Sequence, residues 1–376
     1  MNGKIAALLR DFAAIQKSKQ SMWGYKRAAS AILALEQPIE SFLQPDGTLR
    51  KIPNIGPSSS RVILEVLQTG TSPTVERAIE TSGQAKEVDR RRDLRGHFLS
   101  RAQVVAALRN ASLAGPRLGD YRGDLQMHST WSDGSQTLDE IVAAGIARGY
   151  SFCGVTDHSY GLPIARGVSM TDLAEQHRAI DRLNRKHTGV FRLIKGIEAN
   201  IRADGSVDMT PSELAQLELV VAAPHSSLRV ATDQTSRMVA AVTTPGVHIL
   251  GHPRGRMYGS RPGVTADWDR VFAAAKRAEV AIEIDGDPSR QDVDYDLARH
   301  AVDAGCLFAL DSDAHSTGEL SYAETAIAHA RLAGVPVERI VNCWPTERLL
   351  EWLRRRRDGA ATRPVSRAPR ATTIDR

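Results

Sequence analysis

Histidine, aspartate and glutamate recur at the ends of short apolar runs in this chain. The first run starts at Asp124 and leads to Gln126 and His128, and Asp133 follows just before Gly134. Residues two apart on a strand point to the same face, so Gln126 and His128 are predicted to point outward together. Imidazole and carboxylate groups hold divalent ions such as Zn²⁺, Mn²⁺ and Fe²⁺. The stretch is therefore predicted to form one corner of a metal site.

The same arrangement occurs five more times along the chain. Each time a short apolar run ends in a residue that can bind a metal, and the residues at these ends are Asp157 and His158, Glu198, His225, His252, and Asp313 and His315. A single histidine at a strand end is more often a structural residue than a ligand. A series of five, with carboxylates at matching positions, instead predicts a metal centre.

Segments with a helical spacing of apolar residues separate these runs, at 138–147, 172–186 and 265–278. A repeated order of strand, site residue and helix is typical of a β/α barrel with its chemistry at the C-terminal ends of the strands. We therefore expect an α/β fold over residues 121–350, with the predicted ligands gathered at one end.

These motifs resemble the PHP (polymerase and histidinol phosphatase) family of metal-dependent phosphoesterases, over about residues 121–354. The segments 195–198, 251–256 and 340–345 look most like the PHP domain at the C-terminal end of bacterial family X DNA polymerases. The resemblance implies a distorted TIM-like (β/α)7 barrel. It also implies three metal ions, held by Gln126, His128, Glu198 and Asp313, by Glu198, His225 and His252, and by Asp133, His158 and His315.

In this resemblance Glu198 bridges two ions and, with Asp313, belongs to the catalytic centre. Arg254 and Arg256 directly follow His252. They are predicted either to contact the substrate phosphate, with Arg254 as a catalytic residue, or to lie on a surface loop.

The chain departs from the family at Gln126, where the family motif has its first histidine. A glutamine carbonyl is neutral and matches a nitrogen-preferring ion poorly. Three ligands would remain at this ion, the number that a catalytic zinc often keeps. We therefore expect two or three Mn²⁺ or Zn²⁺ ions, or Fe²⁺, with one of them held more weakly.

Residues 1–80 are predicted to be helical, with a turning loop at 52–57. The helix that follows this loop begins with free backbone amides, which can hold a phosphate. The segment resembles a helix-hairpin-helix motif, and the whole resembles the DNA-binding N-terminal domain of family X polymerases. By that resemblance the DNA-binding residues are Lys51, Ile55, Gly56, Ser58 and Arg61. An ordinary pair of helices joined by a Gly-Pro turn is the alternative.

Charge is distributed unevenly along the 376 residues. Residues 1–115 carry 17 Lys and Arg against 10 Asp and Glu, a net charge of +7, and residues 351–376 carry 8 against 3, a net charge of +5. Since the whole chain has +5, residues 116–350 carry −7. An acidic domain that gathers cations is thus flanked by basic segments that could gather phosphates.

Two other segments have no clear fold of their own. Residues 81–120 are predicted to form a charged connector with one helix near 102–108, which leaves no room for a polymerase palm. The basic tail at 351–376 has no periodicity and is predicted to be disordered. The sequence has no apolar run of about 18 residues, so no membrane span is predicted.

The cysteines Cys153, Cys306 and Cys343 lie in apolar runs and are expected to be reduced, as in a cytoplasmic protein. The sequence thus predicts a cytoplasmic metal-dependent phosphoesterase that acts on DNA, as a 3′–5′ exonuclease or an end-processing enzyme in DNA repair. A small-molecule phosphatase of the histidinol-phosphatase type remains one alternative. A DNA-binding repair accessory with a metal site weakened at Gln126 is the other.

Overall fold

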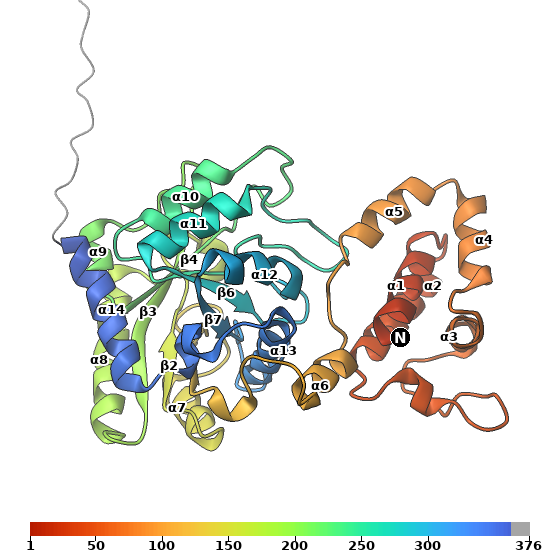
Figure 1. Ribbon diagram of the computed structural model, residues 1–376, viewed down its shortest axis with the longest axis horizontal. Helices are drawn as coiled ribbons and strands as arrows, with labels where there is room; N and C mark the ends of the chain where they lie inside the picture. Colours follow the sequence, from red (N-terminus) through yellow and green to blue (C-terminus); the bar gives the residue numbers. More distant parts are fainter. Residues whose placement is uncertain (362–376) are drawn as a thin grey trace, which may run out of the picture.

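The computed structural model describes residues 1–361, with side chains to residue 357, and consists of a helical domain beside an α/β barrel (Figure 1). The helical domain contains five helices: α1 (Asn2–Ala14), α2 (Lys19–Ala34), α3 (Pro57–Thr69), α4 (Pro73–Ser82) and α5 (Ala85–Asp93). Proline in the first turn of α3 and of α4 favours helix initiation there. The predicted helical N-terminus is therefore present, and its loop at 52–57 leads directly into α3.

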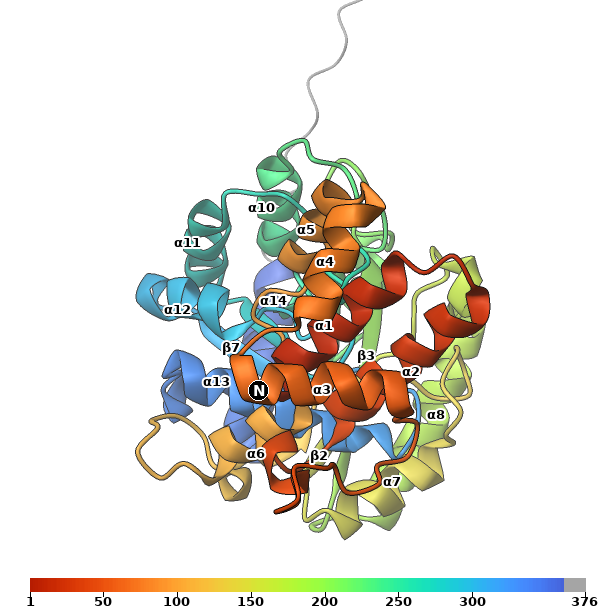
Figure 2. The same cartoon turned by 90° about the vertical axis from the view of Figure 1, so that its right-hand side faces the viewer.

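One apolar core holds the five helices together. Ile5 and Leu9 of α1 pack with Ile32 of α2 and Ile63 of α3, and all four are fully buried. Figure 2 shows α1 and α3 in front of the barrel with α4 and α5 above them. Val88 of α5 belongs to the same core.

Helix α5 was not predicted, because its sequence is almost entirely charged and Val88 is its one buried residue. The predicted helix near 102–108 is present as α6 (Arg101–Arg109). The segment at 81–120 thus contains the α-helices α5 and α6, and α5 packs with the helical domain.

The barrel contains seven strands, each parallel to the next in chain order. They are β1 (Gly123–Asp124), β2 (Phe152–Val155), β3 (Arg192–Asn200), β4 (Leu219–Ala223), β5 (Ile249–Leu250), β6 (Ala281–Asp285) and β7 (Leu307–Asp311). A parallel bridge between Met127 and Ala314 joins the segments that follow the first and last strands. The expected (β/α)7 barrel is confirmed, although β6 was not among the runs recognised in the sequence.

Helices cover the outside of the barrel (Figure 1). They are α7 (Leu138–Ala147), α8 (Met170–Lys186), α9 (Pro211–Leu214), α10 (Thr235–Thr243), α11 (Trp268–Ala278), α12 (Tyr295–Ala304) and α13 (Ala323–Ala333). The three predicted helices correspond to α7, α8 and α11. Apolar residues of the strands and helices, such as Ile197, Phe272 and Phe308, form the largest core of the molecule.

The last helix, α14 (Thr346–Ala361), packs against the barrel. Its Trp352 and Leu353 are buried against Phe152 and Ile194 in one apolar cluster. The prediction of disorder is therefore wrong for residues 351–361, because apolar residues between the arginines anchor this helix. Residues 362–376, the rest of the predicted tail, lie outside the described residues. Within residues 1–361, no helix is both long enough and apolar enough to cross a membrane.

Candidate metal centre

The predicted ligands come from the C-terminal ends of six strands. Five of these strands end just before their ligands, and β3 carries its own within the strand. The side chains concerned are Gln126, His128 and Asp133 beyond β1, His158 beyond β2, Glu198 in β3, His225 beyond β4, His252 beyond β5, and Asp313 and His315 beyond β7. The barrel therefore gathers at one end residues that are almost 190 positions apart in the sequence.

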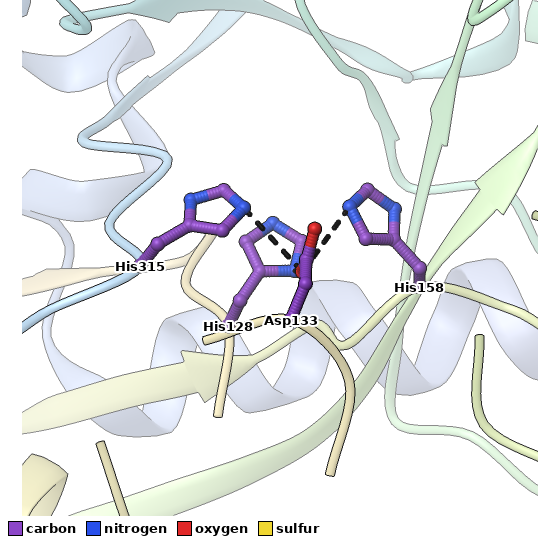
Figure 3. Close-up of side chains that lie close together, drawn as sticks. All are labelled: His128, Asp133, His158 and His315. Carbon is purple, nitrogen blue, oxygen red and sulfur yellow. Dashed lines mark ion pairs between the residues drawn. The ribbon is translucent and has the colours of Figure 1, made fainter. Parts of the chain in front are cut away.

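Three histidines surround the carboxylate of Asp133 (Figure 3). Its Oδ1 lies 3.5 Å from Nε2 of His315, 3.7 Å from Nε2 of His158 and 3.9 Å from Nδ1 of His128. Two ligand atoms at about 2.1 Å from a tetrahedral ion are about 3.4 Å apart. These separations are thus close to those of ligands around a shared cation.

Glu198 faces four histidines and is almost completely buried. Its Oε1 lies 2.8 Å from Nε2 of His252 and 3.2 Å from Nε2 of His225. Its Oε2 lies 3.1 Å from Nδ1 of His158 and 3.3 Å from Nε2 of His128. One carboxylate therefore borders two groups of nitrogens, as a bridging ligand would.

The group around Asp313 contains the glutamine that replaces a histidine. Oδ1 of Asp313 lies 3.0 Å from Nε2 of His128 and 3.5 Å from Nε2 of Gln126. Gln126 is fully buried, and its Oε1 has no hydrogen-bond partner within residues 1–357. The amide oxygen is thus available to a cation.

The residues present fit a metal cluster. Several buried atoms of the cluster make no hydrogen bond in the described part of the chain, and these include Oε2 of Glu198, Nδ1 of His128, Nδ1 of His158 and Nε2 of His225. Leaving such groups unpaired is costly unless a cation lies between them. Divalent ions bound there would neutralise charge on phosphoryl oxygens and lower the pKa of a water molecule. The structure brings all eight predicted ligands together, and their binding of ions remains a prediction.

Neighbouring groups fix the orientation of several ligands. Nδ1 of His225 lies 3.2 Å from Oδ1 of Asn200, and Nδ1 of His315 lies 2.8 Å from the carbonyl oxygen of Asp313. In each ring the other nitrogen therefore remains for a cation. Asp157 accepts hydrogen bonds from the backbone N–H groups of Ser129 and Ser132, and so holds the loop that carries Asp133.

Electrostatics keeps the carboxylates of the cluster ionised. Burial opposes ionisation of Asp133, but the hydrogen bond from His315 and the charges of His158 and His128 lower its pKa to about 2. Burial likewise opposes the charge on Glu198, but His158 and His225 hold the pKa of this carboxyl well below its usual range. Burial lowers the pKa of His315, but its carboxylate neighbours raise it to about 9. A cation that binds His315 must therefore displace a proton.

The arginine in this cluster is Arg290, which the sequence analysis did not identify. Its Nη1 lies 2.7 Å from Oδ2 of Asp313. Arg254, the predicted catalytic arginine, instead forms ion pairs with Asp292 and Asp294. The structure does not bring Arg254 into contact with the ligands described above, and its role in substrate binding remains a prediction.

Arg256 is also engaged away from the ligands. It pairs with Asp294 at 2.8 Å, and its guanidinium lies over the ring of Phe98.

Buried carboxylates within or beside the strands support the ligand loops. Asp124 accepts from the N–H groups of Gln126 and Ser312, Asp311 accepts from the N–H of Leu125, and Glu283 accepts from the N–H of His252. Burial raises the pKa of Asp124 to about 6 and that of Asp311 to about 8. An acidic residue inside an apolar run is rare in a core unless it is paired, and this signal could have identified these residues.

The helical domain carries a surface pocket of about 520 Å³ at the loop before α3. Of the predicted DNA-binding residues, Lys51, Ile55, Gly56 and Ser58 line it. Arg27 of α2 also lines the pocket and was not predicted. Arg61 is exposed on α3 outside the pocket lining.

Comparison with known proteins identifies relatives of both domains. Residues 1–72 match the family model described as a helix-hairpin-helix domain. The chain is 34% identical over 226 residues to the DNA polymerase/3′-5′ exonuclease PolX of Bacillus subtilis, an alignment that covers 60% of this chain and 40% of that protein. The chain thus spans less than half the length of that relative.

A probable phosphatase of Serratia proteamaculans is 30% identical over 253 residues, which cover 63% of this chain and 95% of that protein. A crystal structure of histidinol phosphate phosphatase from Lactococcus lactis, with zinc, L-histidinol and phosphate, has a TM-score of 0.41 and 18% identity over 56% of this chain and 94% of that one. That structural similarity is too low to carry functional information. With the phosphatase matched along nearly its whole length, the chain belongs to the PHP family of metal-dependent phosphoesterases, and it carries a helix-hairpin-helix domain at its N-terminus.

Proposed function

We propose that this chain hydrolyses phosphodiester bonds at DNA ends, as a 3′–5′ exonuclease or an end-processing enzyme in DNA repair. The metal centre would supply the hydrolytic chemistry, and the helix-hairpin-helix domain would hold the DNA backbone. The Bacillus subtilis relative, which is named as both polymerase and 3′–5′ exonuclease, supports this assignment. The segment between the two domains here is too short for a polymerase palm, so polymerisation is not proposed.

The observation that carries the proposal is a short hairpin of the barrel domain at residues 257–261, which contacts the helical domain. Tyr258 packs edge-on against Phe98, and the guanidinium of Arg10 lies over its ring. The N–H of Tyr258 donates to the carbonyl oxygen of Ser289, next to Arg290 in the metal centre. The hairpin therefore connects the helical domain to the loop that carries Arg290.

Arginines on and beside this hairpin form a positively charged strip. Nη1 of Arg229 donates to the carbonyl oxygen of Ser260, and Nε of Arg261 donates to that of Gly255. Burial, together with the nearby positive charges of Arg290 and Arg229, lowers the pKa of Arg261. A strip of cations that leads to a phosphoesterase centre suits a polyphosphate chain such as DNA better than one small phosphate ester.

The two domains are joined by specific contacts. Arg101 of α6 pairs with Glu36 after α2 and with Glu324 of α13. Nη1 of Arg256 donates to the carbonyl oxygen of Gly96 at 3.0 Å. Because the connector is tied to both domains, DNA bound at the loop before α3 (residues 52–57) would keep a defined position relative to the barrel.

Digestion of end-labelled oligonucleotides tests the proposal. The full chain supplied with Mn²⁺ or Zn²⁺, with its metal content measured by elemental analysis, should shorten a 5′-labelled strand stepwise. A small monoester such as p-nitrophenyl phosphate serves as the competing substrate. Efficient hydrolysis of the monoester without cleavage of DNA would contradict DNA as the substrate.

Small-molecule phosphatase activity of the histidinol-phosphatase type is the second candidate. The relative from Serratia proteamaculans, of which the chain covers 95%, is named a probable phosphatase and supports this candidate. The third candidate is a DNA-binding repair accessory with little hydrolysis, which the replacement at Gln126 supports. Salt-dependent DNA binding without turnover in any added metal would favour this third candidate.

A further inference from the structure

A second pocket, of about 240 Å³, lies at the end of the barrel opposite to the metal centre. Two of its residues stand at the N-terminal ends of strands: Arg192 is the first residue of β3, and Glu218 directly precedes β4. Glu198 follows Arg192 by six residues in β3, which is about 20 Å at 3.3 Å per residue. The pocket is therefore separate from the centre in which hydrolysis is proposed.

Helix α14 supplies the rest of the lining from one of its faces. These residues have the spacing i, i+3, i+4 and i+7, and they are Leu350, Leu353, Arg354 and Arg357. Trp352 and Leu353 hold the helix against the barrel in an apolar cluster that includes Ile194 of β3 (Figure 1). Packing thus fixes this face of α14 beside the strand ends, whether or not a ligand fills the pocket.

Positive charge prevails in the pocket, with three arginines against one carboxylate. Glu218 accepts a hydrogen bond from Nη2 of Arg192. Arg354 forms no ion pair with any side chain of residues 1–357, and its Nε donates to the carbonyl oxygen of Leu350 in its own helix. Like charges three positions apart on a helix repel each other, and Arg354 and Arg357 have this spacing. An anion in the pocket would offset their repulsion.

Arg192 also has a donor without an acceptor. Its Nε is buried and makes no hydrogen bond within the described part of the chain, because the ion pair with Glu218 uses Nη2. Leaving a buried N–H group unpaired is costly. A guanidinium has five N–H donors in a fixed fork. An oxyanion in the pocket could therefore accept from Nε while Glu218 keeps Nη2.

The volume and the lining restrict the ligand. Pockets for drug-sized ligands begin at roughly 300 Å³, so a pocket of about 240 Å³ suits a smaller molecule. Planar guanidinium groups match the spacing of phosphate oxygens. Leu350 and Leu353 add an apolar wall that could contact a short carbon group.

We propose that this pocket binds a small phosphate-bearing anion, held by Arg192, Arg354 and Arg357. Such a ligand would connect α14 to the ends of β3 and β4 and would stabilise the closed end of the barrel. The inference goes beyond the proposed function, since it requires neither DNA nor hydrolysis.

Hydrogen–deuterium exchange of the full chain, followed in peptides that cover residues 346–357, tests the proposal. Inorganic phosphate at ten times its dissociation constant should slow exchange in α14 about tenfold, relative to chloride at the same ionic strength. Methylphosphonate is the second probe, because its P–C bond resists hydrolysis. Tighter binding of methylphosphonate would identify an organic phosphate as the ligand, and tighter binding of phosphate would identify the inorganic ion.

Three variants locate the effect. Arg354→Met should weaken phosphate binding roughly tenfold, since it removes a charge-assisted hydrogen bond. Arg355→Met is the matched control, because Arg355 is exposed on the same helix and does not line the pocket. Glu218→Gln removes the carboxylate that competes for Arg192, so phosphate should bind more tightly.

Exchange in α14 that does not respond to phosphate would overturn the proposal. An equal loss of the response in Arg354→Met and Arg355→Met would do the same, and so would protection confined to the strand ends of the metal centre. If Arg354→Met does not fold, Glu218→Gln decides, and binding no tighter than in the native chain would count against the pocket. A chain that binds phosphate here but does not cleave oligonucleotides would contradict the proposed function and leave this inference intact.

Discussion

The candidate metal centre and the pocket at the loop before α3 are both suited to phosphate, but they are built from different parts of the chain. In the metal centre, buried side chains from six strands converge, and neighbouring groups such as Asn200 and Asp157 fix their orientation. The pocket before α3 is formed mainly by one exposed loop, with Lys51 and Gly56 at its surface. The comparison fits the proposed function, in which the barrel would perform hydrolysis and the helical domain would contribute affinity for DNA. Substitutions in the two regions should therefore have separable effects.

Loss of Glu198 should have the largest effect. Glu198→Ala removes the carboxylate that faces four histidines, so at least one ion should be lost and hydrolysis of bis-p-nitrophenyl phosphate should fall by roughly 100-fold or more. Elemental analysis and the rate of ester hydrolysis are the measurements. Glu175→Ala on the exposed face of α8 is the control. Full metal content in Glu198→Ala would exclude Glu198 as a bridging ligand.

A negative charge in the loop before α3 should weaken DNA binding and leave hydrolysis unchanged. Gly56→Asp places a carboxylate where a phosphate is predicted to lie, and DNA affinity measured by fluorescence anisotropy should fall roughly tenfold or more. Hydrolysis of bis-p-nitrophenyl phosphate should not change. A Cβ atom at Gly56 would meet no atom within 4 Å, so Gly56→Ala is a control with the same backbone and no charge. Equal weakening by both substitutions would argue against an electrostatic role for the loop.

Restoring the family histidine tests the weakest part of the metal centre. Gln126→His supplies an imidazole nitrogen to the group of His128 and Asp313, so metal affinity should rise roughly tenfold and activity should saturate at lower Mn²⁺ or Zn²⁺. Gln126→Met has a similar length but no oxygen, and it should bind metal more weakly than the native chain. Identical metal titrations of Gln126→His and the native chain would show that glutamine is already an adequate ligand.

A comparison of His252 with His248, four positions earlier, predicts how the stability of the fold depends on pH. His252, beyond β5, faces Glu198 in the metal centre. His248, before β5, instead has backbone partners for both ring nitrogens. Its Nδ1 accepts from the N–H of Val220, and its Nε2 lies 3.0 Å from the carbonyl oxygen of Leu353. Burial lowers the pKa of His248 to about 3. Between pH 6.5 and 3 the unfolded chain therefore binds a proton that the folded chain does not, and stability falls as pH decreases.

His248 should contribute about 1.4 kcal/mol per pH unit to this loss of stability. Urea denaturation of the metal-free protein at pH 6.5, 5.5 and 4.5 measures the slope. His248→Gln should reduce it by that amount, and His300→Gln, at an exposed histidine, should not. An unchanged slope in His248→Gln would mean that this imidazole takes up its proton in the folded chain.

The sequence by itself determined the type of barrel and which candidate ligands meet at one end of it. A histidine or carboxylate that follows a short apolar run is visible locally, and parallel strands bring such ends to one face. For this reason His128, Glu198 and His315 could be predicted to meet without knowledge of any distance. The helical loop was also predictable, since its Pro and Gly residues determine a turn within a few positions.

Only the tertiary structure decided which charged side chains reach the metal centre. Arg254 directly follows the ligand His252, yet Asp292 and Asp294 hold it in ion pairs. Arg290 comes from the loop after β6, a strand whose Glu283 and Asp285 hide its apolar pattern. Helix α5 and the start of the basic tail were missed for a related reason, because a few buried residues among many charges anchor them. Such pairings depend on contacts between residues far apart in the chain, and local spacing carries no information about them.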